Sequence, residues 1–216
     1  MTVMALRVNP REREELAQQV VEQLQAGIPG AVAELRGSLA EGRGDAYSDI
    51  DVLWEVPDEG FAQAVDRAQN ILASVRPLAS FRIDIDYEKS DRRRLIFVRF
   101  EGVPLFWRLD IDLFAASVQR DPNYDSDNPQ ARGEHFSRTN SALMNAIAAI
   151  KALLRGDEAT AAGLVSRGFE RVSLPVPEGS TDQRLLKLVD DIYEADDAVA
   201  LLAAEIKELY RQAFSS

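Results

Sequence analysis

Apolar residues recur with two different spacings along this chain, and the change between them marks its organisation. Between residues 31 and 114, short runs rich in Val, Ile, Leu and Phe lie between Gly, Pro and Asp residues, which is typical of β-strands. The predicted strands are residues 31–36, 49–54, 79–87, 94–100 and 103–114. Apolar residues four apart predict helices at 10–26 and 58–74. Strand, helix and strand in this order predict a mixed α/β sheet, and Glu101-Gly102 predicts a short hairpin between the last two strands.

The second half of the chain has helical spacing. Residues 119–133 are polar and contain two prolines, so we interpret them as a linker. Helices are predicted at residues 135–154, 157–168 and 180–214. The last is predicted as one long helix, because no Gly or Pro interrupts it and Ser180 and Gln183 form a candidate capping box at its start. The predicted architecture is α/β (α+β): a mixed-sheet domain with flanking helices over residues 1–118, then an all-helical C-terminal domain over residues 134–216.

Composition limits what this fold can bind. The 216 residues are 46% apolar and 28% charged, which is ordinary for a globular protein. The absence of cysteine excludes disulfides and thiolate metal sites. The sequence has no signal-peptide start and no apolar run near the ~18 residues of a membrane helix, so we expect a cytoplasmic protein with no membrane partner. The net charge of −11 predicts no nucleic-acid partner, because neutralising phosphates needs clustered Lys and Arg. That charge suits a small cationic ligand and equally suits solubility.

The most informative chemistry lies between residues 36 and 53. Asp49 and Asp51 are two apart on a predicted strand, so their side chains share a face, roughly 6–7 Å apart. Two carboxylates this close repel unless a cation lies between them, and Mg²⁺ prefers oxygen ligands and phosphates. Upstream, Gly37 permits close approach of the backbone to a phosphate, and Ser38 adds a hydroxyl. The segment therefore predicts a metal and phosphate site. The alternative is a Gly-rich turn followed by an acidic edge strand.

The pattern Gly37-Ser38, ten residues, then Asp49-Ile50-Asp51 resembles the motif of the nucleotidyltransferase superfamily, which includes DNA polymerase beta and the aminoglycoside nucleotidyltransferases. The antibiotic-modifying and antitoxin-type members of that superfamily share further motif positions that this chain matches at Ala40, Gly42 and Ser48. The resemblance covers roughly residues 30–115. It implies a nucleotidyltransferase-fold sheet in the first domain.

The resemblance also implies roles for individual residues. Asp49 and Asp51 would be catalytic and would bind Mg²⁺ in a two-metal site. A nucleoside triphosphate, ATP or another, would be held by Gly37, Ser38, Ser48 and, from the helical domain, Lys151. A solvated helix-face lysine is the alternative for Lys151.

A third carboxylate is expected on the second strand of a hairpin. Asp110 follows Glu101-Gly102 and fits that position as catalytic residue and metal ligand, with Asp112 as its neighbour on the same face. Asp84 and Asp86, in a similar run of residues, are the fallback. The pair that is not used would lie on a solvent-facing edge strand.

The expected activity is Mg²⁺-dependent transfer of a nucleoside monophosphate, AMP from ATP, to a hydroxyl of a small acceptor such as an aminoglycoside-like antibiotic, with release of pyrophosphate. Acidic residues near the C-terminus suit a polycationic acceptor, although a solvated helix face explains them as well: Asp190, Asp191, Glu194, Asp196 and Asp197. The alternatives are an antitoxin-type nucleotidyltransferase that modifies a protein and a catalytically silent nucleotide-binding regulator. A homodimer stays open.

Two remaining features are interpreted as structural. Ser90–Arg94 contains the basic cluster of the chain and predicts a solvated turn, with contact to a nucleotide or partner as the alternative. His135 is the single histidine and lies near a predicted helix start, where a structural or exposed role is expected.

Overall fold

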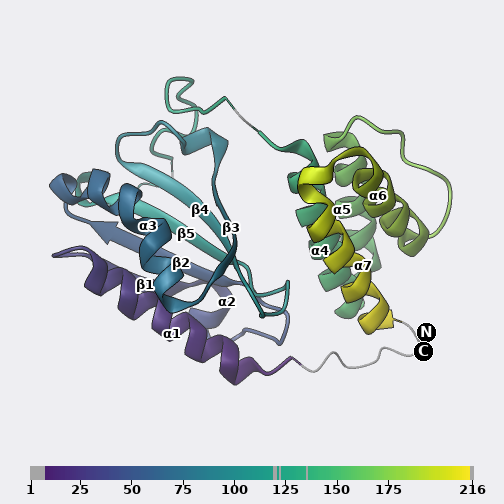
Figure 1. The fold of residues 1–216 in the computed structure, drawn as a ribbon, viewed down its shortest axis with the longest axis horizontal. Helices are drawn as coiled ribbons and strands as arrows, with labels where there is room; N and C mark the ends of the chain where they lie inside the picture. The colour runs from purple at the N-terminus through teal and green to yellow at the C-terminus, as the bar shows by residue number, and fades with distance from the viewer. Residues whose placement is uncertain (1–7, 119–120, 122, 135, 215–216) are drawn as a thin grey trace. The chain divides into compact units, whose positions relative to one another are not determined.

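The computed structural model describes residues 8–118, 121, 123–134 and 136–214 (Figure 1). The described chain forms two compact units, Val8–Phe136 and Ser137–Phe214. His135 lies outside the described residues, so its expected role stays a prediction.

A five-stranded mixed sheet forms the centre of the first unit, in the order β1-β2-β5-β4-β3. Its strands are β1 (Val32–Arg36), β2 (Ile50–Val56), β3 (Leu78–Ile83), β4 (Arg93–Phe100) and β5 (Leu109–Ala115). β2 and β5 pair in parallel, whereas the β1–β2, β3–β4 and β4–β5 pairs are antiparallel. The predicted mixed α/β sheet is therefore confirmed.

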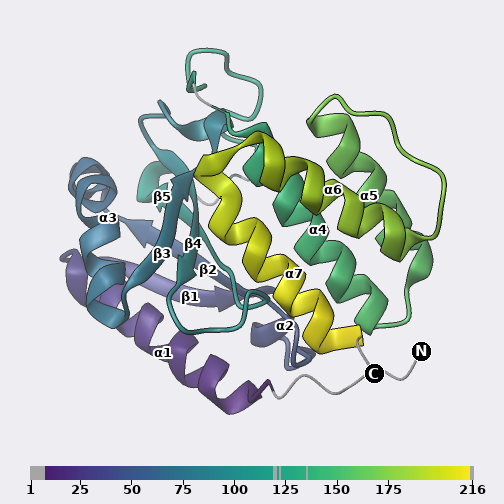
Figure 2. The ribbon, with the colours of Figure 1, turned by 45° about the vertical axis from the view of Figure 1, so that its right-hand side comes forward.

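Two amphipathic helices, α1 (Pro10–Gly27) and α3 (Phe61–Val75), pack against each other and cover one face of this sheet (Figures 1 and 2). Their apolar side chains bury Leu109, Ile111 and Leu113 of β5 in a common core. Because side chains alternate faces along a strand, Asp110 and Asp112 lie on the opposite face. The sheet thus keeps its acidic residues away from the helix-covered core.

Two strand ends differ from prediction. β3 ends at Ile83 rather than residue 87, because the Asp84 carboxylate accepts the Asp86 N–H at 2.9 Å and starts a 3₁₀ turn, Ile85–Tyr87. β5 begins at Leu109 rather than residue 103, since residues 101–108 form turns. The β4–β5 hairpin exists, but its connection is longer than the predicted Glu101-Gly102.

The second unit is helical, with α4 (Arg138–Leu154), α5 (Glu158–Arg171), α6 (Thr181–Ala195) and α7 (Ala200–Phe214) (Figure 2). α6 and α7 pack against each other and both contact α4. The predicted capping box is present at the start of α6: the Ser180 hydroxyl accepts the Gln183 N–H, and the Gln183 side chain accepts the Ser180 N–H. Over the described part of the chain, no helix combines the length and the apolar composition needed to cross a membrane.

The prediction of one helix over residues 180–214 is wrong, because the chain breaks at Asp196. This residue is extended (φ −145°, ψ 98°), and its carboxylate accepts the Ala198 N–H at 3.0 Å, starting the 3₁₀ turn Asp197–Val199. The Thr139 hydroxyl donates to the same carboxylate at 2.6 Å. An aspartate that bonds nearby backbone competes with the helix, and here a contact from α4 adds to that competition.

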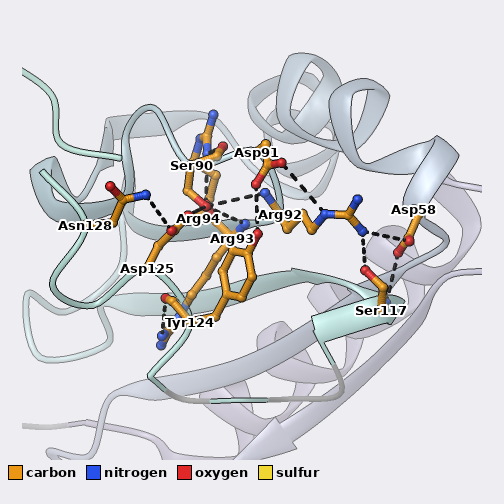
Figure 3. A network of polar contacts seen from close by, with 10 residues as sticks. All are labelled: Asp58, Ser90, Asp91, Arg92, Arg93, Arg94, Ser117, Tyr124, Asp125 and Asn128. Carbon is orange, nitrogen blue, oxygen red and sulfur yellow. Dashed lines mark hydrogen bonds and ion pairs between the residues drawn. The ribbon is translucent and has the colours of Figure 1, made fainter. Parts of the chain in front are cut away.

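The basic cluster at the start of β4 is not a solvated turn (Figure 3). Ser90 and Arg93 are buried, with 2% and 5% of their surface exposed. The Ser90 hydroxyl donates to Asp125 at 2.6 Å, and Arg92 donates to the Asp58 carboxylate at 2.9 Å. These side chains connect β4 to the start of α3 and to the chain that follows β5.

The interpretation of residues 119–133 as a linker is also corrected. The described residues of this segment belong to the first unit and bond to it repeatedly. The Tyr124 hydroxyl donates to Asp91 at 3.0 Å (Figure 3). Backbone bonds join Lys89 to Ala131 and Gly133 to Ile85, both at 2.7 Å. The assignment of separate domains at 1–118 and 134–216 stays a prediction.

Candidate functional site

The turn between β1 and β2 brings a glycine against an acidic side chain. β1 ends at Arg36, the register partner of Asp51 on β2. Gly37 follows with φ +61°, a backbone conformation that favours glycine, and starts the short helix α2 (Gly37–Ala40). A Cβ atom at position 37 would lie 2.5 Å from Asp51 Oδ2. The Gly37-Ser38 backbone therefore lies directly beside the Asp51 carboxylate, as the predicted phosphate and metal site requires.

The three predicted catalytic carboxylates come from two parallel strands. Asp49 immediately precedes β2, and Asp51 of β2 is the register partner of Asp110 on β5. Adjacent strands are roughly 4.8 Å apart, so partners in register present their side chains next to each other on one face. The structure therefore brings Asp110 next to Asp51.

The fallback residues lie elsewhere in the first unit. Asp84 and Asp86 belong to the 3₁₀ turn after β3, which is the sheet edge opposite β1. Asp86 forms an ion pair with Arg132 at 3.2 Å. The register thus favours Asp110 as the third carboxylate, although its catalytic role stays a prediction.

Arg108 binds the Asp110 carboxylate. Its Nε donates to Asp110 Oδ1 at 2.5 Å, and its Nη2 donates to Oδ2. Burial by itself lowers the pKa of Arg108. The hydrogen bond with Asp110 and the charges of Asp110, Asp49 and Asp51 outweigh burial and raise that pKa above its ordinary value. Arg108 therefore lies in the combined field of all three carboxylates.

Asp112 has a different environment from Asp110. Burial raises the pKa of its carboxyl, although the hydrogen bond and charge of Arg93 and the charge of Arg36 oppose that shift. Arg93 Nε donates to Asp112 Oδ1 at 3.1 Å, and the Arg93 guanidinium lies over the Tyr87 ring, 4.4 Å from its centroid. This pair ties β5 to β4, so Asp112 contributes to packing beside the candidate site.

The loop before Asp49 depends on a residue that the motif did not indicate. Arg13 of α1 is 1% exposed and donates through Nη1 to the carbonyl oxygens of Asp45 and Ser48, the latter at 3.4 Å. Burial lowers the pKa of Arg13, while the nearby acids, Asp49 among them, oppose that shift. The signal in the sequence was its spacing: Arg13 precedes Leu16, Ala17 and Val20 on the buried face of α1.

Two further residues are predicted to bind the nucleotide. Ser48 is buried (3% exposed), and its hydroxyl bonds within the loop, donating to Asp45 Oδ1 at 3.0 Å. Lys151 is on α4 of the second unit and is partly buried there. A role in nucleotide binding stays a prediction for both residues.

The donor chemistry of the site fits Mg²⁺, since all three carboxylates supply oxygen ligands. Nevertheless, among the described residues no group of three or more His, Asp or Glu side chains is placed to hold a metal ion. Arg108 occupies the Asp110 oxygens instead. Asp49 and Asp51 are the residues that would hold a metal, and Asp110 would join them once separated from Arg108.

The helical unit contains a cavity of about 560 Å³ within the size range of small-molecule sites. Its wall is formed by α5, α6 and the loop between them, through Phe169, Leu174, Pro175, Pro177, Lys187, Asp191, Glu194 and Ala195. Lys187 pairs with Asp191, so Glu194 leaves the polar part of the wall with a net negative charge. Elsewhere in the predicted acidic run, Asp190 pairs with Lys207 at 2.5 Å.

Comparison with known proteins finds structural matches only. No protein-family model and no curated protein matches the sequence. The chain is similar to a cytoplasmic RNA terminal U-transferase (15% identity, TM-score 0.37, covering 82% of this chain and 46% of that one). It is similar to the polymerase core of TRAMP, an RNA surveillance complex (13% identity, TM-score 0.37, covering 99% of this chain and 62% of that one). It is also similar to a protein from H. pylori described as a candidate nucleotidyltransferase (14% identity, TM-score 0.30, covering 96% of this chain and 95% of that one).

The matched structures include proteins described as a U-transferase and as a candidate nucleotidyltransferase. The nearer resemblance to aminoglycoside enzymes stays a prediction. This chain spans less than two thirds of the length of the U-transferase and of the TRAMP core. At these identities and TM-scores, the likeness carries no argument about activity or acceptor.

The expectation of no nucleic-acid partner is contradicted by the structures to which this chain is similar, which include an RNA terminal U-transferase and the polymerase core of an RNA surveillance complex. The error has a physical cause. A net charge of −11 sums over the whole chain, whereas a nucleic acid responds to the charges near its phosphates. Arg99 and Arg108 lie in the first unit together with the acidic residues, so the sum does not exclude a local basic surface.

Proposed function

We propose that this protein is a Mg²⁺-dependent nucleotidyltransferase that moves a nucleoside monophosphate, AMP from ATP, to a hydroxyl group and releases pyrophosphate. One observation carries the proposal: Asp51 and Asp110 are register partners on parallel strands, and Gly37 lies against the Asp51 carboxylate. Acidic side chains and a closely approaching backbone are the parts that a metal-bound triphosphate needs.

In the proposed mechanism, Asp49 and Asp51 would hold Mg²⁺, and Asp110 would complete a second metal position. Bound Mg²⁺ would neutralise charge on the triphosphate and orient it. The backbone of Gly37 and Ser38 holds the terminal phosphates. Asp110 accepts or orients the proton of the attacking hydroxyl. As the acceptor oxygen bonds to the α-phosphorus, the bond from that phosphorus to pyrophosphate breaks.

The proposed acceptor is a small hydroxyl-bearing cation such as an aminoglycoside-like molecule. The net charge of −11 supports this choice, since it suits a small cationic ligand. A protein acceptor and a silent nucleotide-binding regulator are the alternatives.

The test measures pyrophosphate release with Mg²⁺ and each ribonucleoside triphosphate. The acceptors supplied are aminoglycosides, lincosamides and a short oligoribonucleotide with a free 3′ hydroxyl. Asp49→Asn and Asp110→Asn should each abolish acceptor-dependent release. Asp86→Asn should keep it, because Asp86 lies in the turn after β3.

The matched control for folding is Asp66→Asn, at an exposed position on α3. Release only with an antibiotic would support the small acceptor, and release only with the oligoribonucleotide would assign an RNA acceptor instead. Acceptor-dependent release that survives Asp49→Asn would refute the proposed function.

A further inference from the structure

The proposed mechanism gives no task to Arg108, although its guanidinium binds both carboxylate oxygens of Asp110. Its side chain is 27% exposed and that of Asp110 22%. The pair is bidentate, with both guanidinium donors on the two oxygens of one carboxylate, a geometry that gives strong charge-assisted hydrogen bonds. The guanidinium also lies 5.1 Å from the centroid of the Phe97 ring. Two independent contacts therefore hold Arg108 in place.

The positive charge of Arg108 acts on all three carboxylates of the candidate site. Asp49 and Asp51 both interact with it electrostatically, in addition to Asp110. Neighbouring carboxylates repel one another, and a cation near them relieves that repulsion. Arg108 thus supplies a single positive charge where the proposed function places a divalent one.

The same contact competes with the proposed tasks of Asp110. Both of its oxygens accept hydrogen bonds from Arg108, so a metal ion or an acceptor hydroxyl would have to share these oxygens with the guanidinium or displace it. Among the residues that the structure describes, three acidic side chains do not converge on one point. The acidic site is therefore assembled only in part.

We propose that Arg108 is a built-in counter-cation, which holds Asp110 in the absence of ligand and is displaced from it when the divalent metal binds. This inference rests on the proposed function. Arg108 is then a positioning residue: it stabilises the acidic site between turnovers and opposes metal binding in the absence of a nucleotide. The cost of breaking the Arg108–Asp110 pair links metal binding to assembly of the third carboxylate.

The experiment measures Mn²⁺ binding to the full chain without nucleotide, from the electron paramagnetic resonance signal of free Mn²⁺. Arg108→Gln should bind Mn²⁺ at least about tenfold tighter than the wild type, because it removes a positive charge within a few ångströms of the ligands. Arg108→Lys keeps the charge without the planar fork and should fall between the two. Arg67→Gln is the matched control and should bind like the wild type, since Arg67 is exposed on α3, which covers the sheet face opposite Asp110, and donates to the Gly27 carbonyl oxygen at 2.8 Å.

A second pair of variants tests whether the competition is for Asp110. In an Asp110→Asn background, Arg108→Gln should give a much smaller gain in affinity, because contacting residues are not additive. A gain of the same size in that background would overturn competition for Asp110. If Arg108→Gln does not fold, as judged by circular dichroism, Arg108→Lys decides by the same readout.

The failure of this inference and the failure of the proposed function give different results. Asp49→Asn should weaken Mn²⁺ binding strongly if the proposed metal site exists. Equal binding by wild type and Asp49→Asn would refute the site itself. Weakened binding in Asp49→Asn together with unchanged or weaker binding in Arg108→Gln would overturn only the role of Arg108.

Discussion

Replacing Gly37 by alanine should damage the site much more than the fold. Gly37 has φ +61°, so any other residue pays about 1 kcal/mol of backbone strain. The added Cβ would also lie 2.5 Å from Asp51 Oδ2. The carboxylate is the far end of a side chain and can rotate away. The total loss of unfolding free energy is therefore expected to be about 1–2 kcal/mol, a fall of roughly 2–8 °C in Tm for a chain of this size.

The functional loss should be far larger, because the Asp51 carboxylate would have to leave its position between Gly37 and Asp110. Misplacement of a reacting group by about 1 Å can cost on the order of 10²-fold in rate. We expect Gly37→Ala to lose about 10²-fold in pyrophosphate release and to bind Mn²⁺ more weakly. The assays are those described for the proposed function, with Tm measured by calorimetry.

Gly42→Ala is the matched control for this prediction. Gly42 has φ +65°, so alanine there carries the same backbone strain, but nothing lies within 4 Å of the added Cβ. The two variants should lose similar stability, and only Gly37→Ala should lose metal binding and activity. Equal activity in the two variants would refute the reasoning that Gly37 is required by its contact with Asp51.

Three further predictions concern parts of the molecule outside the acidic site. Arg13→Met should lower the unfolding free energy by about 2–3 kcal/mol, because the loop carbonyls lose a buried donor; a urea transition within error of the wild type would contradict this. Asp196→Ala should cost about 1–2 kcal/mol, because the cap and the bond from Thr139 are both lost; unchanged urea stability would contradict it. Burial, with the charge of Asp182, raises the pKa of Tyr210 to about 12. The unfolded phenol ionises first, so stability should fall as pH rises from about 10 towards 12. Tyr210→Phe should remove that loss of stability. In a pH titration followed by absorbance at 295 nm, the variant should also lack the tyrosine that has a pKa of about 12.

Some of the site follows from local sequence alone. Asp49 and Asp51 share a face because side chains in an extended chain alternate. The strand before them was predicted to end at Gly37, and there the structure has a positive φ that glycine tolerates. The choice of Asp110 over Asp84 followed from its place on the second strand of a hairpin, and the register beside Asp51 agrees with it.

Other features depended on contacts between residues far apart in the chain. No Gly or Pro near Asp196 predicts the helix break there. The break is stabilised by a hydrogen bond from Thr139, which is 57 positions away in the sequence. The segment after β5 is polar like a linker, yet Ser90 and Asp91 bind it to the first unit. In both cases the hydrogen bonds that decide the local structure come from another part of the chain, so the local sequence pattern could not predict them.

The sequence by itself determined the class of fold, the shared face of Asp49 and Asp51 and the glycine turn, because each depends on alternation or on the conformational freedom of one residue. Only the tertiary structure decided which charges face one another. Arg13 reaches the loop before Asp49 from α1, Arg93 binds Asp112, and Arg108 binds Asp110. An ion pair depends on distance and burial, and both arise only when the sheet and its helices have packed together.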